Sequence, residues 1–452
     1  MKEEKKRNVG KKEKICILTH YFPPLQHITK RPYFLAYHLS EMGYDVSVIT
    51  TKKNIFHGFI DKTIAYNVNF KIIEIPHQPL EIIYHFVELL RGLRGDNNKS
   101  IGIRELRLLF RLKELRDFFL KLFGPNFDIL YSWIPGALFY MIRKMIAKED
   151  KYDVIISTFP PPSVHIIASV IKFLFPSVKW IADYRDAWYH IVLTDFKLPG
   201  VTEFLKLLER VIVSRADHVV AVSDHIVKIL SENLGREVSL IRNSFGEKES
   251  LRLKKIQQRR KKAGFGKKIF LYTGAFYHGY KVENLFKGIS MLKSRYHNLG
   301  ELMKVEIYGV DNVRINDIVK ENNISDIVEY KGIVENDLIL KIQQEADFLL
   351  FFNYSDSIGG IEKGIITGKL YEYITSGTPI ISIGKYEDSE ANLIIKETGT
   401  GIFVENKPEK IAELIERIII KKQDILFSPN IEKIMDFSSI KMVEKFADLI
   451  IA

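Results

Sequence analysis

The feature that most constrains this chain is an alternation of short apolar segments with longer amphipathic ones. Residues 14–22 (KICILTHYF) and 44–51 (YDVSVITT) are apolar runs of strand length, and a helical segment ending at Gly43 separates them. Such a strand–helix–strand unit predicts parallel strands joined by a right-handed crossover. Further strand-like runs in the first half lie at 127–133, 153–159, 178–185 and 216–223. The first half therefore predicts an α/β domain with a parallel sheet.

The same alternation restarts in the second half of the chain. Apolar runs of strand length lie at 268–276, 304–309, 327–332, 346–353, 379–384 and 400–406. Because 452 residues are too many for one compact core, we predict two Rossmann-like doubly wound domains, residues 15–242 and 243–430. We expect the two domains to face a cleft, with ligands at the carboxyl ends of the strands. In the last segment, 431–452, the stretch SSIKMVEKFADLIIA has the pattern of an amphipathic helix.

The charge of the chain is unevenly distributed. The net charge is +11, and basic residues cluster in a tail at 1–14 and in a block at 252–268. Both clusters are typical of solvated segments, and both also fit attraction to an anionic membrane surface or to phosphorylated substrates. We do not expect nucleic acid as a partner, because no nucleic-acid-binding motif accompanies the charge.

A helical segment at 80–123 interrupts the strand–helix pattern. Its second part, from Leu106 to Phe119, carries a stripe of Leu and Phe with basic residues alongside. This pattern fits a core or dimer face, and it also fits a helix that lies on a membrane surface.

Cysteine usage and hydropathy indicate the compartment. Cys16 is the single cysteine, so it can form no intrachain disulfide, which suits a reducing compartment. The first 14 residues are polar, unlike a signal peptide, and no apolar stretch reaches the ~20 residues of a membrane span. We expect a cytoplasmic protein, or one peripheral at the inner membrane face.

Two segments of the second half carry residues suited to binding phosphate. In the first, TGAFYHGYKVENL (273–285), Gly274 would let the backbone approach a ligand. Lys281 stands at the expected start of the next helix, where its charge and free amides could address a phosphate. The signal is weak on its own, because a lysine is common at an ordinary helix start.

The second segment is GIITGKLYEYITSGTP (364–379). Thr367 and Gly368 stand at the start of a short expected helix, whose amides and dipole would attract a diphosphate. Lys369 would add charge, and Glu372, one turn further, could accept hydrogen bonds from a ribose diol. The alternative is an exposed Lys–Glu pair. We expect no metal, because no Asp-x-Asp pair is present to bridge a diphosphate to one.

The stretch DYRDAW (183–188) follows a predicted strand in the first half. Asp183, Arg185 and Asp186 would lie at the carboxyl end of that strand, where they could orient a sugar or stabilise a leaving phosphate. A structural cluster of salt bridges explains the same residues equally well.

Taken in order, these segments resemble glycosyltransferases of the GT-B fold, of the retaining, family-four type. The matching stretches are KICILTHYFPP, LAYHLSEMGYDVSVIT, DVIISTFPPPSVH, WIADYRDAW, ERVIVSRADHVVAVSDHI, IRNSFGE, LYTGAFYHGYKVENL and GKLYEYITSGTPIISIG. The resemblance implies that a C-terminal helix (431–452) packs back on the first domain. It also implies a nucleotide-sugar donor bound mostly by the second domain and an acceptor bound mostly by the first.

The resemblance assigns roles to particular residues. Lys281 matches a lysine that contacts the donor diphosphate, and Glu372 matches a glutamate that binds the ribose. Arg185, with its neighbour Asp186, matches a position near the transferred sugar. With Lys281, these two form the expected catalytic set.

The sequence also departs from the family pattern in three places. Gly364 stands where the first glutamate of a pair is expected, eight positions before Glu372. Ala275 and Phe276 follow Gly274 where an arginine is usual, and Gln26–His27 replaces a glycine pair in the first loop.

The expected function is transfer of a hexose from a UDP- or GDP-type nucleotide sugar to an acceptor hydroxyl, with retention implied by the resemblance. No other cofactor is expected. The acceptor would be a carbohydrate or a lipid-linked sugar in polysaccharide or glycolipid assembly. Two alternatives stay open at this point: a nucleotide-sugar epimerase, and a non-catalytic GT-B-like scaffold in a polysaccharide-assembly complex.

Overall fold

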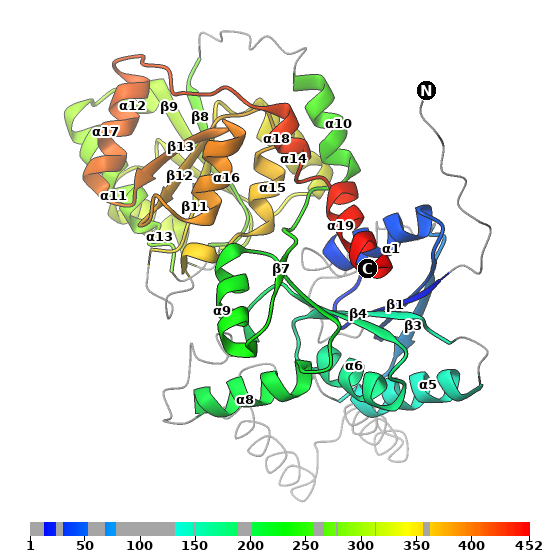
Figure 1. The fold of residues 1–452 in the computed structure, drawn as a ribbon. Helices are drawn as coiled ribbons and strands as arrows, with labels where there is room; N and C mark the ends of the chain where they lie inside the picture. Colours follow the sequence, from blue (N-terminus) through cyan, green and yellow to red (C-terminus); the bar gives the residue numbers. More distant parts are fainter. Residues whose placement is uncertain are drawn as a thin grey trace, which may run out of the picture. The chain divides into compact units, whose positions relative to one another are not determined.

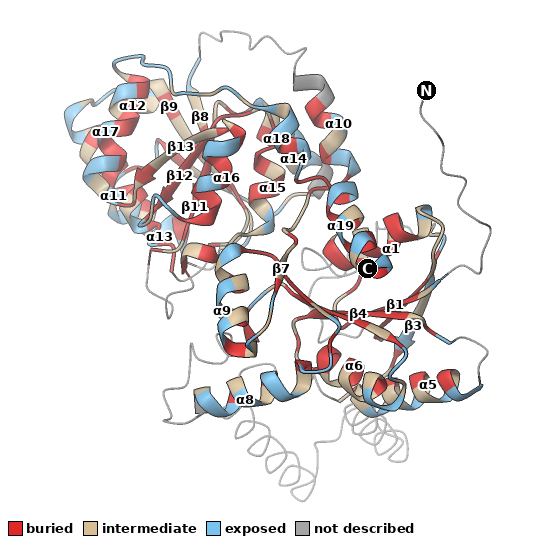
Figure 2. Cartoon of the chain, viewed as in Figure 1, coloured by how far each residue is buried: buried red, intermediate tan, exposed pale blue. Residues whose placement is uncertain are grey.

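The computed structural model describes ten stretches of the chain, drawn in Figure 1. They are residues 13–23, 30–52, 68–77, 132–147, 151–188, 201–256, 266–276, 279–311, 313–355 and 362–452. Figure 2 colours the same view by burial, and most strand residues are buried. The helical segment expected at 80–123 and nearly all of the basic tail lie outside the described residues.

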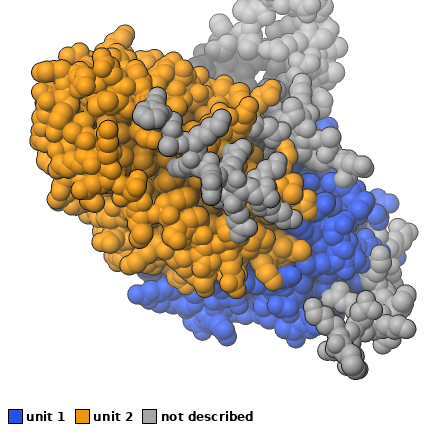
Figure 3. All heavy atoms as spheres, turned by 90° about the horizontal axis from the view of Figure 1, so that it is seen from above, with its two compact units in different colours: residues 1–222, 226–241, 443–452 blue, residues 223–225, 242–442 orange. Residues whose placement is uncertain are grey.

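The chain forms two compact units, coloured separately in Figure 3. Unit 1 comprises residues 1–222, 226–241 and 443–452, and unit 2 comprises residues 223–225 and 242–442. The expected division at 242/243 therefore lies within one residue of the main crossing of the chain between the units.

Unit 1 is built on a seven-stranded sheet in the order β3-β2-β1-β4-β5-β6-β7, and every pair of neighbouring strands is parallel. The strands are β1 (Lys14–Thr19), β2 (Asp45–Thr51), β3 (Lys71–Ile75), β4 (Val154–Phe159), β5 (Lys179–Tyr184), β6 (His218–Ala221) and β7 (Ser239–Leu240). The helices are α1 (Lys30–Glu41), α5 (Ile134–Ala147), α6 (Ser163–Leu174), α8 (Val201–Val213) and α9 (Asp224–Leu234). The strand order reverses between β1 and β4, which makes the sheet doubly wound.

The reversal of strand order decides which face of this sheet each helix covers. The connection from β1 to β2 runs in the opposite direction from the connections β4 to β5 and β5 to β6. Right-handed crossovers therefore place α1 on one face and α6 and α8 on the other. Helix α6 contacts both α5 and α8, so these three helices form one layer.

Unit 2 repeats this architecture with a six-stranded sheet in the order β10-β9-β8-β11-β12-β13, again all parallel. The strands are β8 (Lys268–Thr273), β9 (Met303–Tyr308), β10 (Val328–Gly332), β11 (Phe348–Phe352), β12 (Ile380–Gly384) and β13 (Gly401–Glu405). The helices are α10 (Glu247–Ile256), α11 (Glu283–Arg295), α12 (Leu299–Leu302), α13 (Ile315–Glu321), α14 (Asn336–Glu345), the 3-10 turn η2 (Glu362–Gly364), α15 (Gly368–Tyr373), α16 (Glu390–Thr398), α17 (Pro408–Ile419) and α18 (Ile431–Met435). The last helix, α19 (Ser439–Ile451), begins in unit 2 and ends in unit 1. The predicted α/β fold with two doubly wound sheets is confirmed.

The C-terminal segment divides between the units. Residues 443–452, the larger part of α19, belong to unit 1, whereas residues 431–442 belong to unit 2 and not to the first domain as expected. The reason is packing: Ile434 and Phe437 are buried in a core cluster of unit 2, and the amide of Phe245 donates to the carbonyl of Phe437 (3.1 Å). The amphipathic pattern of the sequence does not reveal this division.

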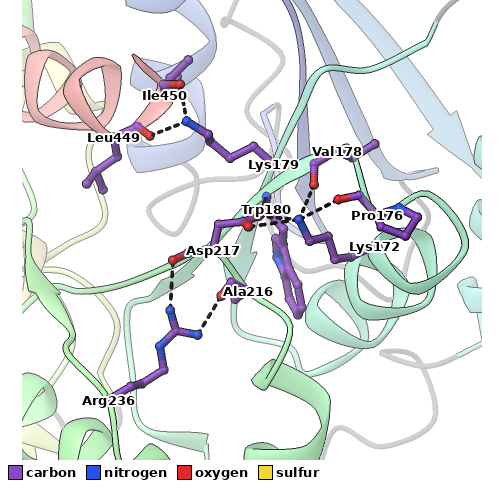
Figure 4. Close-up of polar contacts among 10 residues, drawn as sticks. All are labelled: Lys172, Pro176, Val178, Lys179, Trp180, Ala216, Asp217, Arg236, Leu449 and Ile450. Carbon is purple, nitrogen blue, oxygen red and sulfur yellow. Dashed lines mark hydrogen bonds and ion pairs between the residues drawn. The ribbon is translucent and has the colours of Figure 1, made fainter. Parts of the chain in front are cut away.

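The end of α19 is held at the amino-terminal edge of the unit 1 sheet (Figure 4). Lys179, the first residue of β5, donates from Nζ to the carbonyl of Ile450 (2.8 Å) and lies 3.5 Å from that of Leu449. These carbonyls have no partner within a helix, and a cation there also complements the helix dipole. Nearby, Lys172 Nζ donates to the carboxylate of Asp217 (2.8 Å). This polar cluster is structural, because it lies at the edge opposite to the carboxyl ends of the strands.

Candidate functional site

The site begins where the strand order of unit 2 reverses. The chain moves from β8 in one direction to β9 and β10, and in the other to β11, β12 and β13. In sheets of this kind ligands bind outside the carboxyl ends of the strands at the reversal point. Thr273 is the last residue of β8, and Gly274 follows it. The residues around Gly274 are therefore the first place to look for a binding site.

Gly274 and Lys369 lie against each other at this point. Gly274 has φ +117°, and a Cβ atom there would lie 2.8 Å from both Cε and Nζ of Lys369. Glycine is thus favoured by the backbone conformation, and a methyl group there would displace the end of the lysine side chain. The sequence analysis expected Gly274 to give room to a ligand, and the structure shows that Lys369 uses this room.

Helix α15 is fixed to the end of β8 by hydrogen bonds. The buried Tyr373 hydroxyl accepts from the amide of Thr273 (3.0 Å) and pairs with its Oγ1 (3.1 Å), across 100 residues of sequence. Gln343 Nε2 donates to the same Oγ1 (3.2 Å). Tyr373 and Lys369 are four residues apart, so they share one face of the helix. Anchoring the tyrosine therefore also positions the lysine.

The ammonium of Lys369 has an unusual environment. It lies over the ring of Tyr272, 3.9 Å from the centroid, and makes no hydrogen bond or ion pair with any residue that the structure describes. Burial lowers the pKa of Lys369 from its ordinary 10.5 to about 7, and the Glu372 carboxylate on the next turn opposes this shift. A half-buried cation without an acceptor is costly, so the arrangement favours an anionic ligand.

The start of α15 offers a second polar group without a partner. Thr367 is the residue that precedes the helix, and its buried Oγ1 has no hydrogen-bond partner in the part of the chain that the structure describes. Gly368 is exposed, and a Cβ atom there would meet open space. The helix spans only six residues, so its dipole is weaker than the sequence analysis supposed. The lysine ammonium is the stronger feature for attracting an anion.

Lys281 lies at the same edge of the sheet but is exposed. It has φ +47° and precedes α11 by two residues, so it is not the first residue of the helix as expected. Asn406, which follows β13, donates from Nδ2 to the carbonyl of Tyr280 (2.8 Å) and to Ser355 Oγ (2.9 Å). These bonds hold the segment beside the carboxyl ends of β11 and β13. Gly274 and Lys369 are in contact. Lys281 lies at the same carboxyl edge of the unit 2 sheet.

The structure explains why glycine stands at position 364. A Cβ atom on Gly364 would overlap the side chain of His225 and lie 3.3 Å from Oε1 of Glu390. The Glu390 carboxylate accepts from the amides of Asp224 (2.9 Å) and His225 (2.7 Å), which also belong to unit 2. Burial raises the pKa of Glu390, and these two bonds oppose the shift. A carboxylate is therefore present beside Gly364, but it is held in a structural role that the sequence did not indicate.

In unit 1, Asp183 belongs to a buried ion pair. Its carboxylate accepts from Arg31 Nη2 (2.7 Å) and Nε (3.0 Å), and both side chains are almost completely buried. The guanidinium also lies over the ring of Phe446 in α19, 5.2 Å from its centroid. Of the two interpretations of DYRDAW, the structural one holds for Asp183.

Arg185 and Asp186 follow β5 at the carboxyl edge of the unit 1 sheet. Arg185 is half-buried and donates from Nε to the carbonyl of Phe159 (3.0 Å), and Asp186 is exposed. Burial lowers the pKa of Arg185, and the neighbouring carboxylates oppose this. The expected catalytic set is therefore divided, with these two residues in unit 1 and Lys281 in unit 2.

The sequence analysis missed two buried histidines at this edge of unit 1. His20 follows β1 and His77 follows β3, and their ring centroids lie 5.6 Å apart. His77 Nδ1 is 2.9 Å from Ser132 Oγ, and both histidines are fully buried. The sequence signal for this pair was weak, because His20 lies inside the predicted run 14–22 and β3, which precedes His77, was not predicted.

Comparisons with solved structures cover nearly the whole chain. A sucrose-phosphate synthase from Thermosynechococcus elongatus aligns with a TM-score of 0.62 at 14% identity, over 97% of this chain and 98% of that one. A glycosyltransferase from Rickettsia africae gives 0.58 at 14% identity, over 97% and 98%. WaaG, a glycosyltransferase involved in lipopolysaccharide biosynthesis, gives 0.51 at 13% identity, over 96% and 95%. The chain has the GT-B fold.

The sequence comparisons, and the searches of the described residues for metal sites and membrane helices, found nothing further. Neither the models of protein families nor the curated protein sequences give a match. Among the described residues, no three His, Cys, Asp or Glu side chains are arranged to hold a metal ion. Within the same residues, no helix has the length and apolar character needed to cross a membrane.

Proposed function

We propose that this GT-B protein is a glycosyltransferase that moves a sugar, of hexose type, from a UDP- or GDP-type nucleotide sugar to an acceptor hydroxyl. The observation that carries the proposal is the Lys369 ammonium at the end of β8, where the strand order reverses and no described residue accepts a hydrogen bond from it. A diphosphate supplies the negative charge that this cation lacks. The similar folds of known glycosyltransferases support the same assignment.

In the proposed reaction, the bond between the anomeric carbon and the diphosphate oxygen breaks as the acceptor oxygen bonds to that carbon. The diphosphate leaves with the bonding electrons and takes up the acceptor proton. Lys369 and Lys281 stabilise the charge that develops on the leaving diphosphate. Glu372 accepts hydrogen bonds from the ribose. Arg185 and Asp186 lie near the transferred sugar and orient it. Retention at the anomeric carbon is part of the proposal.

We further propose that the acceptor is a carbohydrate or lipid-linked sugar in polysaccharide or glycolipid assembly. The protein would then act in the cytoplasm, at the inner membrane face. The fold shared with a glycosyltransferase of lipopolysaccharide biosynthesis supports this setting.

One observation favours the alternative of a non-catalytic scaffold. At position 364 the resemblance expects a carboxylate, but His225 and Glu390 fill the space that its side chain would need. A scaffold would bind no nucleotide, or would bind it without turnover.

A panel of UDP- and GDP-sugars, with and without lipid-linked acceptors, tests these proposals. We expect one donor to yield free diphosphate and a glycosylated acceptor, whose anomeric configuration NMR can read. Change of the donor sugar without an acceptor would instead identify an epimerase. Nucleotide binding without any product would favour the scaffold, and the absence of all nucleotide binding would refute the proposed site.

A further inference from the structure

The layer formed by α5, α6 and α8 in unit 1 exposes an unusual number of large apolar side chains. Pale-blue exposed residues mark much of α8 and part of α5 in Figure 2. We call this surface the α5–α6–α8 face. Its exposed apolar side chains are Phe139, Ile146, Phe173, Leu174, Phe204, Leu207 and Val211.

In helix α8, the exposed apolar side chains are not the ones that pack into the core. Its inner side already packs Leu205 and Val213 into unit 1 as buried residues. Phe204, Leu207 and Val211 form a second stripe at spacings of three and four residues, and each is more than half exposed (54–56%). Single exposed apolar residues are normal on a protein surface, but a continuous row marks an interaction surface.

The apolar residues of the face are interspersed with cations. The three helices and the residues directly after α8 carry Arg143, Lys144, Lys172, Lys206, Arg210 and Arg215, of which Lys172 pairs with Asp217 and Lys206 with Glu203. The acidic residues of the same stretch are the exposed Glu203 and Asp217 and the fully buried Glu209, so cations remain in excess. The guanidinium of Arg215 lies 5.1 Å from the ring centroid of Phe173, so the parts contributed by α6 and α8 are contiguous. The face is therefore both apolar and cationic.

We propose that the α5–α6–α8 face docks on an anionic lipid bilayer. Apolar side chains that enter the boundary between headgroups and acyl chains, with basic side chains beside them for the lipid phosphates, are what such a surface binds. The phenylalanines on all three helices supply the apolar part, and the excess of cations supplies the charge complementarity. The docking does not depend on the nucleotide-sugar site, because its residues lie on the outer side of a helical layer in unit 1.

Vesicle co-sedimentation of the full chain tests the docking. The wild type should bind vesicles of phosphatidylglycerol and phosphatidylcholine and should bind pure phosphatidylcholine much more weakly. The test variant carries Phe204→Ser, Leu207→Ser and Val211→Ser. The matched control carries Ile333→Ser, Leu338→Ser and Leu393→Ser, which remove three exposed apolar side chains of unit 2 (64%, 48% and 51% exposed). We expect the test variant to bind at least about tenfold more weakly, and the control to bind like the wild type.

A charge variant and a spectroscopic probe keep the proposal testable even if the triple variant unfolds. Arg143→Gln with Arg215→Gln should weaken binding about 25-fold at low salt, at about fivefold per charge. Because Cys16 is buried, a cysteine introduced as Leu207→Cys can be labelled selectively with a polarity-sensitive dye. Its fluorescence should shift to the blue on the anionic vesicles, and a label at Leu426→Cys in unit 2 should not respond.

Three results would overturn the proposal. The first is that the wild type ignores anionic vesicles. The second is that the test variant binds them unchanged, which would assign the binding to another basic segment such as the tail at 1–14. The third is a label at position 207 that shifts on self-association of the protein and not on vesicles, which would make the face a contact between two copies. None of these results bears on nucleotide binding in unit 2.

Discussion

The environment of Lys369 predicts that nucleotide binding is linked to proton uptake. With a pKa of about 7, its amine is about 90% charged at pH 6 and about 10% charged at pH 8. A bound diphosphate favours the ammonium, so the complex holds a proton that most of the free protein lacks at pH 8. We therefore expect uptake of about 0.9 proton per nucleotide at pH 8. Because the bound form holds the extra proton, affinity must fall as the pH rises.

The size of this effect follows from the fraction of charged lysine in the free protein. Affinity should fall about fivefold between pH 7 and 8 and about ninefold between pH 8 and 9. Below pH 7 the phosphate of the nucleotide itself begins to take up protons near pH 6, so the informative window lies above pH 7. Isothermal titration calorimetry of UDP and GDP in buffers of different ionisation enthalpy measures the proton uptake directly.

Two matched variants separate Lys369 from the other lysine of the site. Lys369→Met should abolish both the proton uptake and the pH dependence. Lys281→Met removes an exposed cation, so it should weaken binding while the proton uptake persists. The reasoning fails if the wild type binds nucleotide at pH 8 without proton uptake, or if Lys369→Met retains it.

Three further substitutions test the structure around the sites. Gly274→Ala should lower the free energy of unfolding by about 1–3 kcal/mol, because the backbone conformation is strained for alanine and the methyl group meets Lys369; thermal melts would show this, and an unchanged melting temperature would contradict it. Asp183→Asn should destabilise unit 1 by about 3–5 kcal/mol in denaturant titrations, because it leaves the buried Arg31 charge uncompensated, and a much smaller loss would mean that water reaches the pair. Glu372→Ala should weaken nucleotide binding by about 1–3 kcal/mol and leave the melting temperature unchanged, and equal affinity would remove the ribose role.

The strands could be predicted from sequence where they are buried on both faces. The runs at 14–22 and 44–51 became β1 and β2, because a parallel strand covered by helices is apolar along its whole length. Strand β3, at the edge of the sheet, was not predicted, since its KIIEI pattern is only partly buried. The two-residue β7 is too short for any periodicity to appear.

The candidate site was only partly predictable. The segments around Gly274 and Lys369 were each identified as phosphate-binding candidates, but their contact depends on the Tyr373–Thr273 hydrogen bonds between segments far apart in the sequence. The helix expected from about Lys281 begins at Glu283, and the left-handed backbone conformation of Lys281 could not be predicted from the spacing of residues. Local sequence patterns identify the residues that could bind a phosphate. Which of these residues contact one another depends on the packing of the folded chain.

The side chains at the end of β8 explain one departure from the family pattern, the missing arginine after Gly274. The resemblance expects an arginine shortly after Gly274, but Phe276 instead turns into the core and stacks on Tyr272, with ring centroids 4.1 Å apart and planes 5° from parallel. Tyr272 also carries the Lys369 ammonium over its ring. A cation on the ring is attracted by its electron-rich face, which partly offsets the cost of burying the charge. The loop after β8 thus contributes an aromatic side chain that supports the cation, and α15 contributes the cation itself. The Lys369 ammonium thus lies at the strand end where the resemblance expects an arginine, and in the proposed reaction it would stabilise the diphosphate there.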